Sequence, residues 1–228
     1  MKKIIVGDVH GCYNSLKEVL AKAELDQAED TLIFVGDLFD RGYDSAEVWK
    51  LVSELKQEMG DRCVVLYGNH EDMLVKYVLY GDTTWTINGM ETTVESFEND
   101  DDVPSIAGLA AWIMDNTTPY YHCTDGTEFY VVHAGRVSDD IEKDSLDDHI
   151  WNRDPIRHTG FGGTVTFIGH TPIEEPFHRT YNEVNALPYD EWIELPKTGL
   201  VDIDTACVFG NRLTAAVVDG NKFKCVAA

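Results

Sequence analysis

The first third of the chain alternates short apolar runs with stretches of helical periodicity. Lys3 to Val6, Thr31 to Val35 and Cys63 to Tyr67 are rich in β-branched residues, and we expect each run to form a strand. Between them, apolar residues recur three and four positions apart, which predicts two amphipathic helices, one with Tyr13, Leu16, Val19, Leu20 and Ala23 on its buried face and one with Val48, Leu51, Val52 and Leu55. This βαβαβ order predicts a parallel sheet.

Local signals refine this first third. Ser15 and Glu18 have the spacing of a capping box at the start of the first helix. The apolar residues after Glu71 again recur at helical intervals as far as Val78, which predicts a third helix.

The remainder of the chain has shorter and weaker patterns. Residues 81–118 have weak periodicity and an acidic stretch, and we expect a cap or insertion there. Asp125-Gly126 and Asp219-Gly220 each lie between two strand-like runs, which predicts two β-hairpins because Asp-Gly readily supplies positive φ angles. Thr164 to Ile168 is a further strand-like run, and the Pro-bearing stretch from Thr171 to Pro196 is predicted to be a surface loop.

Composition places the chain among ordinary globular proteins. It has 228 residues, and no linker divides it, so we expect a single domain over residues 1–228. A formal net charge of −23 argues against binding to nucleic acid or to an anionic membrane. The five cysteines have no CxxC spacing, and no apolar run has the length of a membrane span, so we expect a cytoplasmic protein without disulfides.

Five strand-like runs end in loops that carry a glycine beside metal-competent side chains. These loops are Gly7-Asp8-Val9-His10-Gly11, Gly36-Asp37-Leu38-Phe39-Asp40-Arg41-Gly42, Gly68-Asn69-His70-Glu71, His133-Ala134-Gly135 and Gly169-His170-Thr171. Each motif alone is an ordinary turn composition. Ligands of open parallel sheets bind beyond the carboxyl ends of the strands, so the joint occurrence predicts one shared site.

The converging set offers carboxylate, imidazole and amide groups and no thiolate: Asp8, His10, Asp37, Asn69, His133 and His170. Six ligands are too many for one ion with an open position, but they suit two ions that share a carboxylate, as in metal-assisted hydrolysis of phosphate esters. The mixture of imidazole and oxygen ligands favours two divalent transition-metal ions, with Mn²⁺ preferred and Fe or Zn as alternatives. His122, His149, His158 and His178 lie outside these loops and are interpreted as surface or satisfied structural residues.

The order and spacing of these motifs resemble the phosphoprotein phosphatase family of calcineurin-like metallophosphoesterases. The segments Ile150-Trp151-Asn152-Arg153 and 201–214 resemble its bacterial and phage branch, typified by the bacteriophage lambda serine/threonine protein phosphatase. The resemblance implies an α/β fold in which a β-sandwich of mixed sheets is flanked by helices. It covers nearly the whole chain, least securely at residues 81–118 and 171–196.

The resemblance also implies a role for each motif residue. Asp8, His10 and Asp37 would bind one ion, and Asp37, Asn69, His133 and His170 the other, so Asp37 would bridge them. A hydroxide shared by the two ions would attack phosphorus while Arg41 and Arg153 hold the phosphoryl oxygens. His70, oriented by Asp40, would protonate the leaving oxygen as general acid.

The implied activity is hydrolysis of phosphomonoesters. The preferred substrate is phosphoserine or phosphothreonine in a protein or peptide partner, and phosphotyrosine is a further candidate substrate. The first alternative is a diadenosine tetraphosphate or related dinucleotide polyphosphate hydrolase, because those enzymes share most of these motifs. A non-catalytic binding module is the second alternative, and the intact Asp40, Arg41 and His70 argue against it.

Many relatives have Arg immediately before Gly-Asn-His-Glu, where this chain has Tyr67, so its substrate preference can differ. The sequence leaves the oligomeric state open.

Overall fold

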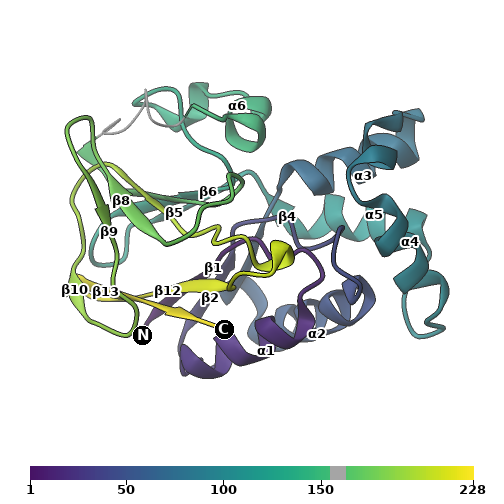
Figure 1. The fold of residues 1–228 in the computed structure, drawn as a ribbon, viewed down its shortest axis with the longest axis horizontal. Helices are drawn as coiled ribbons and strands as arrows, with labels where there is room; N and C mark the ends of the chain where they lie inside the picture. Colours follow the sequence, from purple (N-terminus) through teal and green to yellow (C-terminus); the bar gives the residue numbers. More distant parts are fainter. Residues whose placement is uncertain (155–162) are drawn as a thin grey trace.

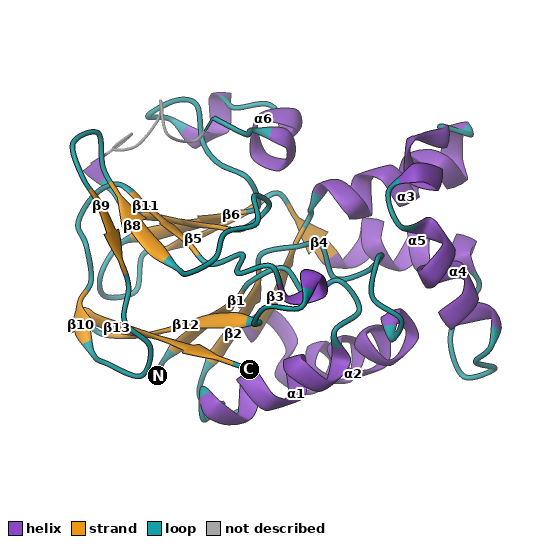
Figure 2. Ribbon diagram, in the orientation of Figure 1, coloured by secondary structure: helices purple, strands orange, loops and turns teal. Residues whose placement is uncertain are grey.

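Two β-sheets packed face to face form the centre of the molecule, and helices cover their outer faces (Figures 1 and 2). The computed structural model describes residues 1–154 and 163–228. Its helices are α1 (Tyr13–Lys22), α2 (Ser45–Met59), α3 (Asn69–Tyr80), α4 (Met90–Glu98), α5 (Ile106–Asn116) and α6 (Leu146–Trp151). Short 3₁₀ turns are η1 (Gly60–Arg62), η2 (Thr83–Ile87), η3 (Ile141–Lys143) and η6 (Cys207–Phe209).

The first sheet contains the predicted βαβαβ unit. Within the described residues its strands follow the order β10-β13-β12-β1-β2-β3-β4. They are β1 (Lys3–Val6), β2 (Thr31–Phe34), β3 (Cys63–Leu66), β4 (Thr117–Thr118), β10 (Ile193–Glu194), β12 (Thr214–Asp219) and β13 (Lys222–Ala227). β1 to β4 are mutually parallel, and β12 pairs antiparallel with β1, so the sheet is mixed.

The second sheet repeats this arrangement with its own parallel centre. Its order within the described residues is β5-β6-β7-β11-β8-β9. The strands are β5 (Tyr120–Cys123), β6 (Phe129–Val132), β7 (Thr166–Ile168), β8 (Phe177–Arg179), β9 (Val184–Ala186) and β11 (Leu200–Asp202). β6, β7 and β11 are parallel to one another, whereas β5 and β8 pair antiparallel at the flanks.

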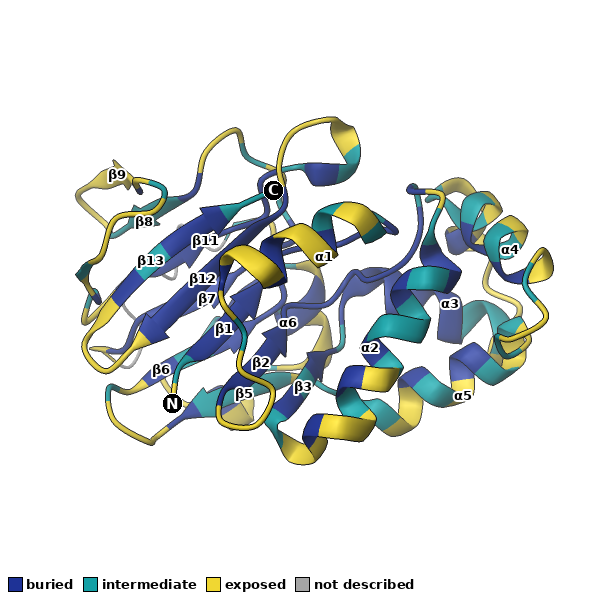
Figure 3. Cartoon of the chain, turned by 90° about the horizontal axis from the view of Figure 1, so that it is seen from below, coloured by how far each residue is buried: buried dark blue, intermediate teal, exposed yellow. Residues whose placement is uncertain are grey.

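Alternation along the strands divides the core into two layers. Ile4 and Val6 of β1 pack in a hydrophobic cluster with helices α1 to α5, whereas Ile5 between them packs in a second cluster with Phe129 and Phe167 of the other sheet. The central strands β1 and β2 are therefore buried on both faces, whereas the outer face of α1 reaches solvent (Figure 3). The α/β sandwich implied by the sequence is confirmed.

Two local predictions are wrong. Ser15 and Glu18 form no capping box, because α1 begins at Tyr13 after Cys12 and both residues lie inside the helix. The stretch from Thr171 to Pro196 is not only a surface loop, because it contains β8, β9 and β10. These strands have two or three residues, and all of β9 is exposed, so no alternation of buried and exposed positions reveals them.

Residues 81–118 fold mainly as η2, α4 and α5. Trp85, Phe97 and Ile113 anchor this segment in the hydrophobic cluster that also contains residues of α2 and α3.

Both Asp-Gly hairpins form as predicted, between β5 and β6 and between β12 and β13. All five cysteines are free thiols. No helix in the described ranges combines the length and the apolar character that crossing a membrane requires.

Candidate metal centre

The candidate site lies where the parallel strands of both sheets end. β1, β2 and β3 lead into the loops that carry Asp8, Asp37 and Asn69, and β6 and β7 lead directly to His133 and His170. Because parallel strands present their carboxyl ends at the same edge, two such edges facing each other bring five loops together. All the predicted ligands are buried.

Asp37 lies at the centre of this cluster. Its Oδ1 is 3.4 Å from His133 Nε2, and its Oδ2 is 3.5 Å from His10 Nε2. In each of two groups, the potential ligand atoms all lie within 4.8 Å of one another, and Asp37 belongs to both groups. One group is His10, Asp37 and His70, and the other is Asp37, His133 and His170. The geometry therefore offers two adjacent positions for cations around one shared carboxylate.

The histidines are oriented as metal ligands require. His10 Nδ1 donates to the carbonyl oxygen of Phe39 at 2.8 Å, and His133 Nδ1 donates to that of Val35 at 2.9 Å. Each ring therefore directs the lone pair of Nε2 at the cluster. Burial lowers the pKa of His10 to about 3, so the imidazole is neutral and available to a cation.

Unpaired polar atoms in the cluster fit bound cations. His170 Nδ1 contacts Asn69 Oδ1 at 2.8 Å, while its buried Nε2 has no hydrogen-bond partner among the described residues. His133 Nε2 also faces Asn69 Oδ1, at 3.0 Å, although its proton is on the other nitrogen. Converging lone pairs and buried carboxylates are costly unless positive charge compensates them, and two divalent cations would supply it.

Asp8 adds a further buried carboxyl group to the site, but it lies apart from the two groups of potential ligand atoms. Its carboxylate accepts a hydrogen bond from His170 N at 3.0 Å. Burial and the nearby Asp204 raise its pKa well above the usual range. Within the described residues, Asp8 belongs to neither of the two groups of potential ligand atoms. In the group that contains His10 and Asp37, the third member is His70 and not Asp8.

Asp202 and Asp204 extend the acidic cluster and were not predicted as site residues. Both follow or end β11, the third parallel strand of the second sheet. Burial raises the pKa of Asp204 to about 6, and its electrostatic neighbours include Asp37, Arg41 and Arg153. Segment 201–214 was noted only for its family resemblance, because Asp202 and Asp204 have no neighbouring glycine of the kind that identified the other loops.

Backbone strain is concentrated at this site. Left-handed φ angles of 44° to 74° occur at His10, Asp37, Asp40, Arg41 and His170, all of them predicted site residues. Such angles are unfavourable for residues other than glycine and persist where the surrounding structure requires a particular side-chain direction. A Cβ on Gly68 would collide with Asp37, and one on Gly169 would collide with the carboxylate of Asp8. The motif glycines therefore allow the ligands to approach.

Glu71 holds the central loop in place. Its buried carboxylate accepts hydrogen bonds from the backbone N–H groups of Asp37 at 2.8 Å, Leu38 at 2.9 Å and Gly68 at 3.0 Å. The loop after β2 is thus fastened to the start of α3. Sequence analysis assigned no role to Glu71, because its partners in the loop lie 33 and 34 residues away.

His70 and Asp40 form a buried pair beside the cluster. His70 Nδ1 donates to Asp40 Oδ2 at 2.7 Å, and the same carboxylate accepts from Trp85 Nε1 at 2.7 Å and from Thr93 Oγ1 at 2.6 Å. His70 Nε2 lies 4.0 Å from Asp37 Oδ2 and is buried without a hydrogen-bond partner among the described residues. Burial opposes protonation, but Asp37 and Asp40 outweigh it and raise the pKa of His70. Residues of η2 and α4 thus orient the predicted general acid.

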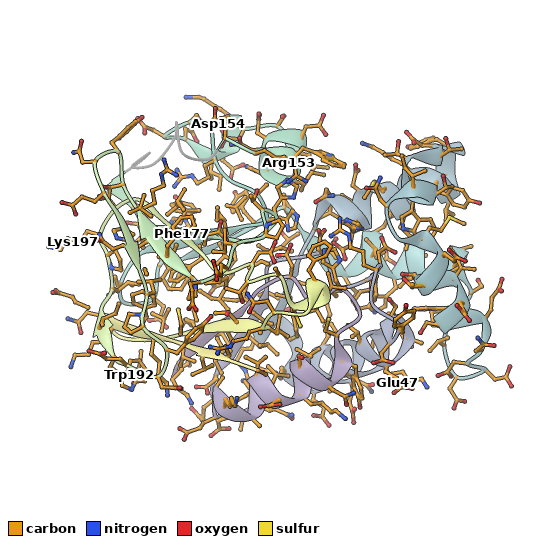
Figure 4. All side chains as sticks on the ribbon, viewed as in Figure 1. Glu47, Arg153, Asp154, Phe177, Trp192 and Lys197 are labelled. Atoms are coloured by element: carbon orange, nitrogen blue, oxygen red, sulfur yellow. The ribbon has the colours of Figure 1, made fainter. Side chains whose placement is uncertain are left out.

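The two predicted arginines lie near the cluster, Arg41 partly buried and Arg153 exposed. Arg41 Nη1 is 2.6 Å from His10 Nε2, and its guanidinium lies 5.6 Å from the ring centre of Phe209. Arg153 follows α6 (Figure 4). Together with burial and His133, its charge lowers the pKa of His170 to about 3. Both positions suit anions that approach the metal centre.

Arg41→Ala is expected to raise KM for a phosphate ester about 10- to 100-fold and to weaken inhibition by free phosphate in parallel. A guanidinium can hold two phosphoryl oxygens, and hydrogen bonds to charged groups are worth roughly 1.5–3 kcal/mol. Steady-state kinetics with phosphate as inhibitor measure both effects. Arg179→Ala on β8 is the control, and unchanged phosphate inhibition in Arg41→Ala would make Arg41 a structural residue.

Of the histidines predicted to be surface or satisfied structural residues, one differs from that prediction. His122 Nε2 pairs with Glu128 at 2.8 Å, and His178 Nε2 donates to the carbonyl oxygen of Thr198 at 2.8 Å, as expected of structural residues. His149 is buried, but neither ring nitrogen has a hydrogen-bond partner among the described residues, so it is neither exposed nor satisfied. His158 lies outside the described residues.

Comparison with known proteins adds three findings. The family model for calcineurin-like phosphoesterases matches residues 1–211. The asymmetrical bis(5'-nucleosyl)-tetraphosphatase PrpE of Bacillus subtilis (strain 168) is 30% identical over 92% of this chain and 88% of its own length, and that of Halalkalibacterium halodurans is 31% identical over 92% and 87%. A protein serine/threonine phosphatase from Saccharomyces cerevisiae has the same fold, with a TM-score of 0.69, 15% identity and coverage of 100% of this chain and 80% of its own.

Proposed function

The chain belongs to the calcineurin-like phosphoesterase family, and on this premise we propose that it hydrolyses bis(5'-nucleosyl) tetraphosphates to unequal nucleotides. This activity was the alternative in the sequence analysis, where phosphoprotein hydrolysis was preferred. The observation that reverses the preference is the similarity, along more than nine-tenths of the chain, to relatives named as asymmetrical tetraphosphatases. The proposed partner is accordingly a small nucleotide.

The residues of the cluster suit this chemistry. His10, Asp37, Asn69, His133 and His170, with Asp8 beside them, would hold two divalent ions, for which we propose Mn²⁺. Bound ions would neutralise the phosphate chain and activate a water molecule. Arg41 and Arg153 would hold phosphoryl oxygens, and His70 would give the leaving oxygen a proton from Nε2 while Asp40 fixes the ring.

Protein phosphatase activity is the second candidate. It is supported by the motif resemblance to the phosphoprotein phosphatase family, whereas the shared fold of the yeast enzyme bears on architecture only. A phosphoserine or phosphothreonine ester has a more basic leaving oxygen than a polyphosphate, so the two candidates place different demands on His70.

A direct comparison of substrates tests the proposal. With Mn²⁺ supplied, kcat/KM for diadenosine tetraphosphate is expected to exceed that for phosphoserine and phosphothreonine peptides by at least an order of magnitude. Chromatography of the products should give two nucleotides of unequal phosphate number. A tenfold preference for the phosphopeptides would instead support the second candidate.

A further inference from the structure

A cavity of about 630 Å³ lies along α3, the helix that begins at the candidate ligand Asn69. It lies between one face of α3, the strands β4 and β5, and the segment from η3 to α6, and Figure 1 shows α3 and α6 at the same end of the sandwich. We call it the α3–α6 cavity, and its lining includes Tyr67, Leu79, Tyr80, Tyr120, Asp144 and His149. Its volume falls in the range of small-molecule sites.

The rim of the cavity is apolar and aromatic although it faces solvent. Leu79 is 48% exposed, Tyr80 78% and Met114 55%, and the partly buried rings of Tyr67 and Tyr120 complete the lining. Clustered exposed apolar side chains around a hollow are typical of a binding site, because an occupant would remove them from water. Aromatic rings in such a rim favour a flat occupant that can stack.

Unpaired polar groups lie at the inner wall. The side chain of Asp144 is fully buried, and its Oδ2 accepts from Val137 N at 2.9 Å, but its Oδ1 has no hydrogen-bond partner in the described part of the chain. His149 Nε2 lies 3.9 Å from Asp144 Oδ2, beyond hydrogen-bond distance. Burial lowers the pKa of His149, which leaves the neutral ring with one donor and one acceptor. These unpaired atoms are themselves shielded from solvent, so they lie just behind the surface of the cavity wall.

The cavity and the metal centre share structural elements. Asp72, Val75, Lys76, Leu79 and Tyr80 line one face of α3, which begins at the candidate ligand Asn69. With a rise of 1.5 Å per residue, the lining starts about 5 Å from Asn69 along the helix and ends about 17 Å from it. On the other wall, His149 precedes Trp151 by two residues, and the Trp151 ring centre is 6.3 Å from that of His170.

The charge of the cavity selects against phosphate. Asp72, Glu142 and Asp144 line it, and Lys76 is paired with Asp72 at 2.7 Å. Carboxylates repel a phosphate group but accept hydrogen bonds from an amino group. The cavity therefore suits the uncharged, flat, amino-bearing end of a molecule whose phosphates lie at the metal centre.

We propose that the α3–α6 cavity binds a nucleobase of the substrate, with the ring stacked among the tyrosines. The amino group of an adenine, a hydrogen-bond donor, would lie against the acidic wall formed by Asp72, Glu142 and Asp144. This assignment rests on the proposed function. It gives Tyr67 a role in substrate preference, since its ring lines the proposed base site.

Inhibition constants of two monophosphates measure the contribution of the base. With p-nitrophenyl phosphate as substrate, adenosine 5'-monophosphate is expected to inhibit the Mn²⁺-loaded enzyme at least about tenfold more strongly than ribose 5-phosphate, as base stacking predicts. Leu79→Trp, which fills the cavity, and Tyr80→Ala, which removes a stacking ring, should bring the two constants within about twofold. Calorimetric titration with adenosine 5'-monophosphate should give the same loss of affinity.

The matched control is Tyr181→Ala, which removes an equally exposed tyrosine between β8 and β9. It should leave the ratio of inhibition constants unchanged, and kcat and KM for p-nitrophenyl phosphate within about twofold of wild type. Equal inhibition by both monophosphates in the wild-type enzyme, or a ratio that both cavity variants leave unchanged, would overturn the assignment.

The two proposals can fail separately. Rapid diadenosine tetraphosphate turnover that Leu79→Trp does not slow would refute the base site and leave the proposed function intact. Preference for phosphopeptides, with Leu79→Trp raising KM only for them, would refute both and make the cavity a peptide-docking groove. A wild-type ratio near tenfold that collapses in the cavity variants would support the base site even if the best substrate proved to be another nucleotide.

Discussion

Asp37→Asn is expected to abolish stoichiometric binding of both metal ions and to lower kcat/KM by at least about 10²-fold. Asp37 is the one carboxylate that belongs to both groups of ligand atoms, with its two oxygens directed at histidines on opposite sides. Loss of a residue that only supports a metal ligand already costs roughly 10–100-fold in metal affinity or activity. Loss of a shared ligand and its negative charge should cost no less.

Metal content per chain is the primary measurement, because it does not depend on turnover. Asp115→Asn, the same chemical change on the exposed face of α5, is the control and should retain two ions. The asparagine at position 37 can still accept the hydrogen bond from His70 N, so the loop should keep its shape and thermal unfolding can verify it. Two bound ions with wild-type turnover in Asp37→Asn would refute the bridging role.

The sequence predicts the parallel half of the first sheet because the local signal is strong there. β1, β2 and β3 are runs of consecutive buried apolar residues that end in glycine loops, and helices of ten or more residues separate them. β8, β9 and β10 carry no such signal. Their side chains are exposed or half-buried, and pairing with β11 and β13 across the fold, not local propensity, makes them strands.

The candidate metal centre could be proposed from the sequence because each candidate ligand follows a strand-like run in a loop that carries a glycine. The contacts that surround the candidate ligands could not be predicted, since they join distant parts of the chain. Trp85 and Thr93 reach Asp40 across 45 and 53 residues from a segment whose periodicity is weak. Asp144 and His149 are ordinary in sequence, and only the buried Asp144 Oδ1 and His149 ring nitrogens, which have no hydrogen-bond partner among the described residues, distinguish them. Supporting contacts of this kind depend on tertiary packing.

The role of His70 can be separated from that of the metal ligands by the basicity of the leaving group. An alkoxide from phosphoserine needs a proton as it departs, a nitrophenolate hardly does, and a nucleotide phosphate needs less than an alkoxide. His70→Asn is therefore expected to keep both ions yet lose roughly 10²–10⁴-fold in kcat on a phosphoserine peptide, the usual value of positioned acid–base catalysis. Losses on diadenosine tetraphosphate and on aryl phosphates should be smaller.

The surroundings of His70 give this prediction its controls. Asp40→Asn should show a milder form of the same substrate dependence, because Trp85 and Thr93 still fix the side chain at position 40 while its charge is lost. His122→Asn is the matched control, since His122 forms the same kind of pair with Glu128, at 2.8 Å, away from the metal centre. Its kinetics should equal those of wild type on every substrate.

Equal losses on alkyl, aryl and anhydride substrates would contradict the assignment of His70 as general acid. In the structure, His70 Nε2 faces Asp37 at 4.0 Å and belongs to one group of potential metal ligands. A uniform loss accompanied by a lower metal content would therefore make His70 a ligand, and a uniform loss with both ions retained would place its action on the attacking water. A loss that grows with the basicity of the leaving oxygen is expected only if the proton on Nε2 is transferred to that oxygen.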